Sequence, residues 1–358
     1  MANFTAQVTT SGDPASGNFA MTMTQVADSN PPVDPPGNPD PPNPIDPPED
    51  NWTQPALPPQ PSVQPGSSGR ILRAKDFGGI AAAMNAANDG DTIAVAQNAP
   101  REPFVISKIV AVRADHVTWD FHDLPSDQLA YGGKGAIVPV SAASIISGFD
   151  ISGVGLDDSR AELRAAVRVD ADGYCTIEDC HFHQCQNGVA AGSFNAVVEI
   201  KQTRLIGNGL PGAGGQTHNL YIGDINELTL TDVESTGPVD AHAIKFRGYR
   251  LIVDGGSYES KVGRAFDVPN GGKFTIKRAT LTKPADANDG TMIGYMSEAR
   301  TSGESNENTL EGCTINAGRQ SGNQIVTQGG TITFAPDCQW QGTLTVSGSG
   351  TVVGLPAR

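Results

Sequence analysis

The chain repeats a short apolar pattern about every 23 residues. The central apolar residues of successive copies are Ile177, Ile200, Leu230, Val253 and Ile276. They are separated by 23, 30, 23 and 23 residues, so an excess of 7 is confined to one interval. A fixed period of this size, with insertions limited to single repeats, is typical of a solenoid.

Within most copies apolar and polar residues alternate, which predicts β-strands because successive side chains of a strand point to opposite faces. One period accommodates about three strands of 4 to 5 residues with their turns. The position three residues after the central one is usually small, as expected where coils stack like on like. These small residues are Cys180, Thr203, Val233, Gly256, Ala279 and Cys313. We therefore expect an all-β parallel β-helix, since the Leu/Asn skeleton of a leucine-rich repeat is absent.

Composition divides the chain into three parts. Residues 1–29 alternate weakly and would form one or two short strands, which are too few to fold alone. Residues 30–69 are rich in proline and contain no Lys or Arg, which predicts an extended, semi-rigid linker or stalk. Residues 70–358 contain the repeats and would form the body.

The body opens with an Ala-rich stretch in which Phe77, Ile80 and Met84 follow helical spacing, ahead of the Gly-Asp-Thr-Ile sequence at 90–93. A short helix here would cap the first coil, which would otherwise expose core and a strand edge. This start resembles the pectate-lyase-like superfamily, over roughly residues 70–350. The resemblance implies a right-handed parallel β-helix with an N-terminal capping helix. The superfamily includes polysaccharide lyases, glycoside hydrolases, epimerases and virus spikes, so activity must be argued from a site.

Charge and hydropathy exclude several classes of partner. The net charge of −15 argues against duplex nucleic acid or anionic lipid, because both require dense positive charge. No run of 18 apolar residues occurs, so membrane insertion is not expected. The first residues lack the basic region and apolar core of a secretory signal peptide. A protein of this kind working outside a cell would leave by another route, such as release in a virus particle.

The cysteines raise the question of a metal site. Cys175, Cys180 and Cys185 are spaced by five, with His181 and His183 between them. This spacing matches no standard zinc pattern, and an odd total of five cysteines argues against a disulfide framework. We expect the cysteines to be core residues, and we expect neither a metal nor a cofactor.

A second strand aligns from coil to coil through inward apolar pairs at offsets of 22, 31, 24 and 22. These pairs are Val167/Val169, Val189/Ala191, Leu220/Ile222, Ile244/Phe246 and Phe266/Val268. Residues between the pairs must point outward, and neighbouring coils lie about 4.8 Å apart. Tyr221, Lys245, Arg247 and Asp267 are therefore expected to form one solvent-facing cluster.

His218 and His242 occupy equivalent positions of this strand and should stack, beside a glycine-rich loop at 206–216 that would form a mobile groove wall or an ordinary insertion. On one interpretation the cluster binds sugar hydroxyls or a uronate carboxylate. In a lyase, Lys245 or a histidine would then remove the proton α to that carboxylate while Arg247 neutralises it. On the other, the charged residues form ordinary cross-coil ion pairs and the histidines cap a core edge.

The N-terminal segment, the proline-rich stalk and the β-helix body together resemble a bacteriophage head fibre, tail fibre or spike. The resemblance implies that residues 1–29 attach to another virion structural protein, that the body binds host-surface polysaccharide, and that the protein is a homotrimer on the particle surface. Two alternatives stay open. One is a polysaccharide lyase or glycoside hydrolase, although no carboxylate pair shows the spacing of a glycosidase. The other is a decoration protein of the particle that binds no glycan.

Overall fold

The computed structural model describes residues 6–11, 20–25, 54–157, 164–288, 290–298, 302–318, 324–342 and 345–355. The chain divides into two compact units, residues 1–50 and 51–358. In the first unit, β1 (Ala6–Ser11) and β2 (Ala20–Gln25) form an antiparallel pair.

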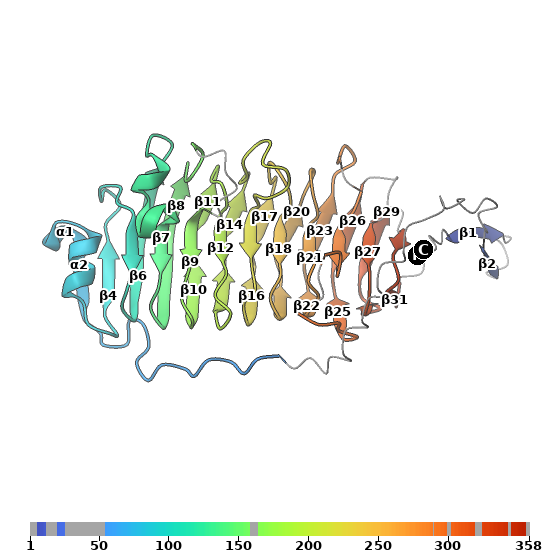
Figure 1. Ribbon diagram of the computed structural model, residues 1–358, viewed down its shortest axis with the longest axis horizontal. Helices are drawn as coiled ribbons and strands as arrows, with labels where there is room; N and C mark the ends of the chain where they lie inside the picture. Colours follow the sequence, from blue (N-terminus) through green and yellow to red (C-terminus); the bar gives the residue numbers. More distant parts are fainter. Residues whose placement is uncertain are drawn as a thin grey trace, which may run out of the picture. The chain divides into compact units, whose positions relative to one another are not determined.

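The second unit is a right-handed parallel β-helix whose coils stack along one axis (Figure 1). Three strand lines, which we call A, B and C, run along it. Line A comprises β3 (Ile71–Arg73), β4 (Thr92–Val95), β6 (Val110–Asp120), β8 (Ala143–Ser152), β10 (Tyr174–Glu178), β13 (Val197–Lys201), β16 (Glu227–Thr231), β19 (Arg250–Asp254), β22 (Lys273–Lys277), β25 (Asn308–Glu311), β28 (Thr331–Phe334) and β31 (Thr351–Val353).

The long strands β6 and β8 continue from line A into line B. Line B then comprises β11 (His181–His183), β14 (Arg204–Ile206), β17 (Glu234–Thr236), β20 (Ser257–Glu259), β23 (Thr280–Lys283), β26 (Thr314–Ala317) and β29 (Gln339–Gly342). Line C comprises β5 (Phe104–Ile106), β7 (Gly135–Pro139), β9 (Ala165–Val169), β12 (Val189–Ala191), β15 (Leu220–Ile222), β18 (Ile244–Phe246), β21 (Phe266–Val268), β24 (Ile293–Tyr295), β27 (Ile325–Thr327) and β30 (Val346–Ser347).

The register of line A is the one that the repeat predicts. Ile177 pairs with Ile200, Ile200 with Leu230, Leu230 with Val253, and Val253 with Ile276. All five side chains are buried in one continuous apolar core. The 23-residue period is therefore one turn of the helix, and the apolar ladder follows from it.

The corner between lines A and B explains the small residues of the repeat. Two positions after the central apolar residue the backbone is left-handed, at Asp179 (φ 52°), Gln202 (φ 46°), Asp232 (φ 50°), Gly255 (φ 79°) and Arg278 (φ 53°). A left-handed residue turns the chain sharply, and the following position then faces the equivalent position of the next coil. At Gly256 an added Cβ would lie 2.2 Å from the carbonyl oxygen of Val233, so no larger residue fits there.

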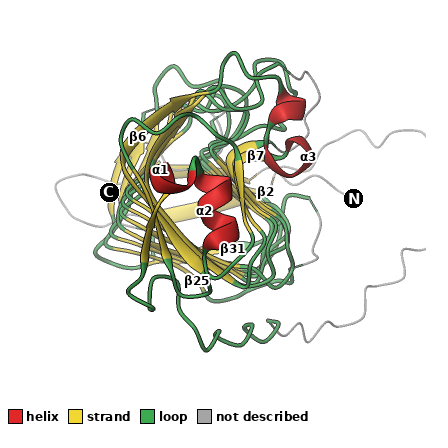
Figure 2. Ribbon diagram, turned by 90° about the vertical axis from the view of Figure 1, so that its left-hand side faces the viewer, coloured by secondary structure: helices red, strands yellow, loops and turns green. Residues whose placement is uncertain are grey.

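The sequence predicts one short helix at the first coil, and the structure has two short helices there (Figure 2). α1 (Ala74–Phe77) and α2 (Ile80–Ala86) bury Ile80 and Met84 against the core. The predicted continuous apolar face is wrong at Phe77, which is 42% exposed. The chain turns at Gly78, whose φ of 86° ends α1, and this break turns Phe77 away from the core. Two further short turns, η1 (Ser126–Gln128) and α3 (Ala130–Gly133), follow β6.

The proline-rich segment joins the body earlier than its composition indicates. Residues 54–68, which we call the strap, belong to the second unit and run along the outside of the solenoid (Figure 1). Asn226 Nδ2 donates to the carbonyl oxygens of Pro55 (3.1 Å) and Ala56 (2.9 Å), and its Oδ1 accepts from Gln54 Nε2 (3.0 Å). The Tyr174 hydroxyl donates to the Pro58 carbonyl (2.7 Å). Residues 54–69, at the end of the expected linker, therefore lie in the second unit, which begins at residue 51.

All five cysteines are buried and free, in agreement with the expected core role. Burial raises the pKa of Cys175, Cys180 and Cys185 to about 12. Within the part of the chain that the structure describes, no helix is long and apolar enough to cross a membrane.

Candidate functional site

The line C strands bring the predicted site residues together. Tyr221 pairs directly with Lys245, and Lys245 with Asp267. The flanking inward residues, such as Ile244 and Phe246, are fully buried. The predicted alignment of this strand is therefore confirmed.

The expected exposure of the cluster is wrong for two of its four members, Lys245 and Asp267. The side chain of Lys245 is 8% exposed and that of Asp267 is 1% exposed. A chain segment after β24 covers them: Glu298 pairs with Lys245, and the Ser302 hydroxyl donates to the Arg247 carbonyl at 2.6 Å. The residues that cover the site belong to an insertion rather than to the repeat, so strand alternation alone could not place them.

Asp267 is the centre of a buried ionic network. Its Oδ1 pairs with Arg264 Nη1, and its Oδ2 lies 3.6 Å from Lys245 Nζ and 3.3 Å from His242 Nε2. Arg264 Nη1 also donates to the Ser297 hydroxyl at 2.9 Å. A buried carboxylate is tolerated when cations and hydrogen bonds satisfy it in this way.

Glu298 joins the network from its outer side. Its Oε1 lies 2.9 Å from Lys245 Nζ, and its Oε2 lies 2.5 Å from Arg247 Nη2. The two carboxylate oxygens thus contact two different cations, in an arrangement we call the Glu298 bridge. The Glu298 side chain is 41% exposed and that of Arg247 is 27% exposed, so solvent reaches this edge of the network.

Three rings stack beside the cations. The rings of Tyr221 and His218 are 5.3 Å apart, and those of His218 and His242 are 5.1 Å apart with an interplanar angle of 15°. The predicted histidine stack is confirmed. His218 Nδ1 accepts the backbone N–H of His242 (3.2 Å), and His242 Nδ1 accepts that of Arg264 (2.8 Å). Each ring therefore carries its proton on Nε2.

Burial lowers the pKa of His218 and of His242 well below the ordinary value, and the nearby cations lower both further. Both imidazoles are neutral near pH 7 as a result. Because Nδ1 is occupied by a backbone donor and Nε2 holds the proton, neither ring presents a lone pair to a substrate. The chemistry that this arrangement favours is the binding of an anion by cations rather than the removal of a proton.

Sequence reasoning missed Arg264 and Glu298. Arg264 lies two positions before Phe266, as His242 lies two before Ile244, so extending the histidine alignment by one coil would have found it. Glu298 falls in the interval from Ile276 to Leu310, which is 34 residues long and exceeds the period by 11. That excess indicates an insertion without showing where it folds.

The glycine-rich loop lies next to the histidine stack in sequence, and its C-terminal end is fixed. The Asp240 carboxylate accepts backbone hydrogen bonds from Gly215 (2.9 Å), Gln216 (3.0 Å) and Thr217 (3.2 Å). The C-terminal end of the loop is therefore hydrogen-bonded to the next coil, whether the loop forms a groove wall or is an ordinary insertion.

Comparison with solved structures finds the same fold in the crystal structure of an alginate lyase from Paenibacillus sp. str. FPU-7. The two chains align with a TM-score of 0.58 and 14% sequence identity, over 80% of this chain and 100% of the other. No family model matches the sequence, and a search of curated proteins gave no match. At 14% identity the likeness shows the fold alone. The comparison therefore confirms the parallel β-helix that the repeat predicts.

Proposed function

We propose that the β-helix body binds an acidic polysaccharide through Lys245 and Arg247. The Glu298 bridge is the observation that carries this proposal, because it holds a carboxylate between two cations at a solvent-accessible edge. A uronate carboxylate has the same charge and geometry and would take the same place when Glu298 turns outward. Arg and Lys donors to a carboxylate form charge-assisted hydrogen bonds, which are among the stronger polar contacts in proteins.

The structural neighbour supports the substrate class without assigning it. That protein is an alginate lyase, and alginate is an acidic polysaccharide. Lyase activity is the second candidate for this chain, because the same fold supports it there. The proton positions of His218 and His242 favour binding over elimination, since an eliminating enzyme needs a free base near the acidic carbon.

The role as a bacteriophage fibre or spike is a proposal that rests on the layout of the chain. The separation into residues 1–50 and 51–358 is consistent with a small attachment unit and a binding body. Attachment to a virion structural protein, a location on the particle surface and assembly as a homotrimer belong to this proposal. Negative-stain images of particles labelled with antibody to the body test the location, and sedimentation tests the trimer.

The binding proposal is tested by titrating the full chain with alginate and with neutral dextran. We expect saturable binding of alginate only. Arg247→Gln should weaken it about 10- to 100-fold, the equivalent of losing one charge-assisted hydrogen bond. Glu298→Gln should strengthen it, because the internal competitor for the two cations loses its charge.

A matched pair on another face controls for general charge effects. Arg204 and Glu234 form an ion pair on line B, and Glu234 is 39% exposed, close to the exposure of Glu298. Arg204→Gln and Glu234→Gln should leave alginate binding unchanged. Equal binding of alginate and dextran would contradict the proposed site. So would equal effects on alginate binding of the substitutions at Arg247 and Glu298 and those at Arg204 and Glu234. Release of unsaturated products, lost in Arg247→Gln, would establish the lyase alternative instead.

A further inference from the structure

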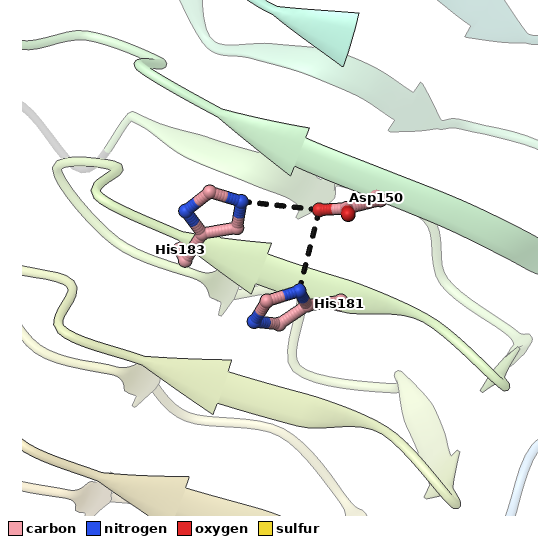
Figure 3. Close-up of side chains that lie close together, drawn as sticks. All are labelled: Asp150, His181 and His183. Atoms are coloured by element: carbon pink, nitrogen blue, oxygen red, sulfur yellow. Dashed lines mark hydrogen bonds and ion pairs between the residues drawn. The ribbon is translucent and has the colours of Figure 1, made fainter. Parts of the chain in front are cut away.

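A second cluster of polar side chains lies on the outward face of line B, away from the ionic network. It consists of Asp150 on β8 and of His181 and His183 on β11 (Figure 3). Asp150 pairs in register with His181, and His183 is two residues further along the same strand. Residues two apart on a strand share a face, so both imidazoles lie on the side of the sheet that carries the carboxylate.

The donor atoms of these three residues converge. Asp150 Oδ1 lies 3.3 Å from His181 Nδ1 and 3.1 Å from His183 Nε2. One donor atom from each residue lies within 4.8 Å of the other two. Zinc is bound by imidazole nitrogen and carboxylate oxygen at about 2.0–2.2 Å in a tetrahedron, whose edges are then about 3.3–3.5 Å. The two observed separations are close to such edges.

The rings are already arranged for a shared ligand. His181 and His183 stack with centroids 4.5 Å apart, which directs one nitrogen of each toward the same oxygen. His181 Nε2 makes no hydrogen bond with the described residues, so the ring can carry its proton there when a metal ion takes Nδ1.

The cluster is open to solvent. The side chains of His181, His183 and Asp150 are 28%, 29% and 36% exposed, so an ion can enter without unfolding a coil. The net charge of −15 also favours cations near the surface. Three protein ligands leave a fourth tetrahedral position for water, as in open zinc sites.

The cysteines take no part in this cluster, although they flank the two histidines in the sequence. Cys180 and Cys185 are buried in the core, while His181 and His183 face outward. The ligand that completes the set, Asp150, lies 31 residues before His181 and reaches it only because one turn of the solenoid separates them. A zinc pattern sought within one segment could not include it.

We propose that Asp150, His181 and His183 form a binding site for one divalent transition-metal ion of the zinc type, which links two successive coils. Imidazole nitrogen favours zinc, nickel, copper and iron, whereas magnesium and calcium favour all-oxygen sites. Such an ion stabilises the folded chain in proportion to its affinity, because the unfolded chain lacks the assembled site.

The test is a titration of the full, metal-free chain with zinc chloride. Calorimetry measures the binding, and the melting temperature is recorded with and without zinc. We expect one zinc per chain, a higher melting temperature with zinc, and no competition from a large excess of magnesium. Asp150→Asn and His183→Ala should each weaken zinc binding by more than about 100-fold, since loss of even an outer-shell partner costs about 10- to 100-fold. Cobalt should give the visible absorption of a tetrahedral site in the wild type but not in these two variants.

His116→Asn is the matched control, because His116 is an exposed histidine outside the cluster and its φ of 49° is one that asparagine tolerates. It should bind zinc as the wild type does. Melting of each variant without zinc shows whether it is folded, so a loss of binding can be assigned to the site. A wild type that binds no zinc saturably, or Asp150→Asn and His183→Ala variants that bind it undiminished, would overturn the proposal.

Discussion

Replacing Asp267 by asparagine removes the central charge of the buried network at nearly constant volume. At 3.6 Å from Lys245 Nζ the carboxylate attracts that cation with about 4–5 kcal/mol at an effective dielectric constant of about 20. Arg264 loses its ionic partner as well. Removing one member of a buried ion pair leaves an uncompensated charge, so we expect Asp267→Asn to lower the free energy of unfolding by about 3–5 kcal/mol.

Glu298→Gln provides the comparison, because it removes the other carboxylate that pairs with Lys245, at a position that is 41% exposed. Ion pairs this open to solvent contribute about 0–1 kcal/mol. Urea denaturation of both variants, followed by circular dichroism, measures the difference. Equal losses in the two variants, or a loss below about 1 kcal/mol for Asp267→Asn, would refute the argument that burial of Asp267 determines the stability of this face.

Two further outcomes follow from the histidines and from the strap. Because the folded pKa of His218 and His242 lies well below the unfolded value of about 6.5, only the unfolded chain takes up their protons as the pH falls. The stability that these two histidines contribute is therefore complete above about pH 6.5. Below that pH the free energy of unfolding decreases by up to about 2.7 kcal/mol per pH unit for the two groups together. His218→Gln should remove about half of this pH dependence, measured by urea denaturation at several pH values. Limited proteolysis of the wild type should stop before Gln54, whereas in Asn226→Ala it should advance toward Pro65 with the circular dichroism of the body unchanged. Identical cleavage in both proteins would mean that Asn226 does not hold the strap.

The periodic part of the molecule could be predicted from the sequence. Alternation places Leu230 and Phe246 inward, and the recurrence of the same pattern in each coil fixes which residues pair, so the registers of lines A and C follow. Alternation is visible within a single strand, and the spacing is visible because it recurs from coil to coil. A one-residue error would turn every side chain to the wrong face, which makes such a register strongly determined.

What the sequence could not predict lies outside the period. Glu298 belongs to an insertion, and nothing in the spacing shows that an insertion folds back over Lys245 rather than away from it. Asp150 meets His181 through the winding of a whole coil. In the sequence Asn226 looks like any other polar residue. Its hydrogen-bond partners lie in the strap, about 170 residues earlier in the chain, so its role could not be predicted.

The course of the strap determines how the body bears a mechanical load. Chain entering from the N-terminal side first meets the hydrogen bonds of Asn226, near β16, and only later reaches β3 in the first coil. A pull on the N-terminal segment is thus applied to the side of the solenoid and shared among the coils between Asn226 and Tyr174 before it reaches the end. The pairing of β3 with β4, which a pull from the capped end would peel apart strand by strand, is shielded from that force.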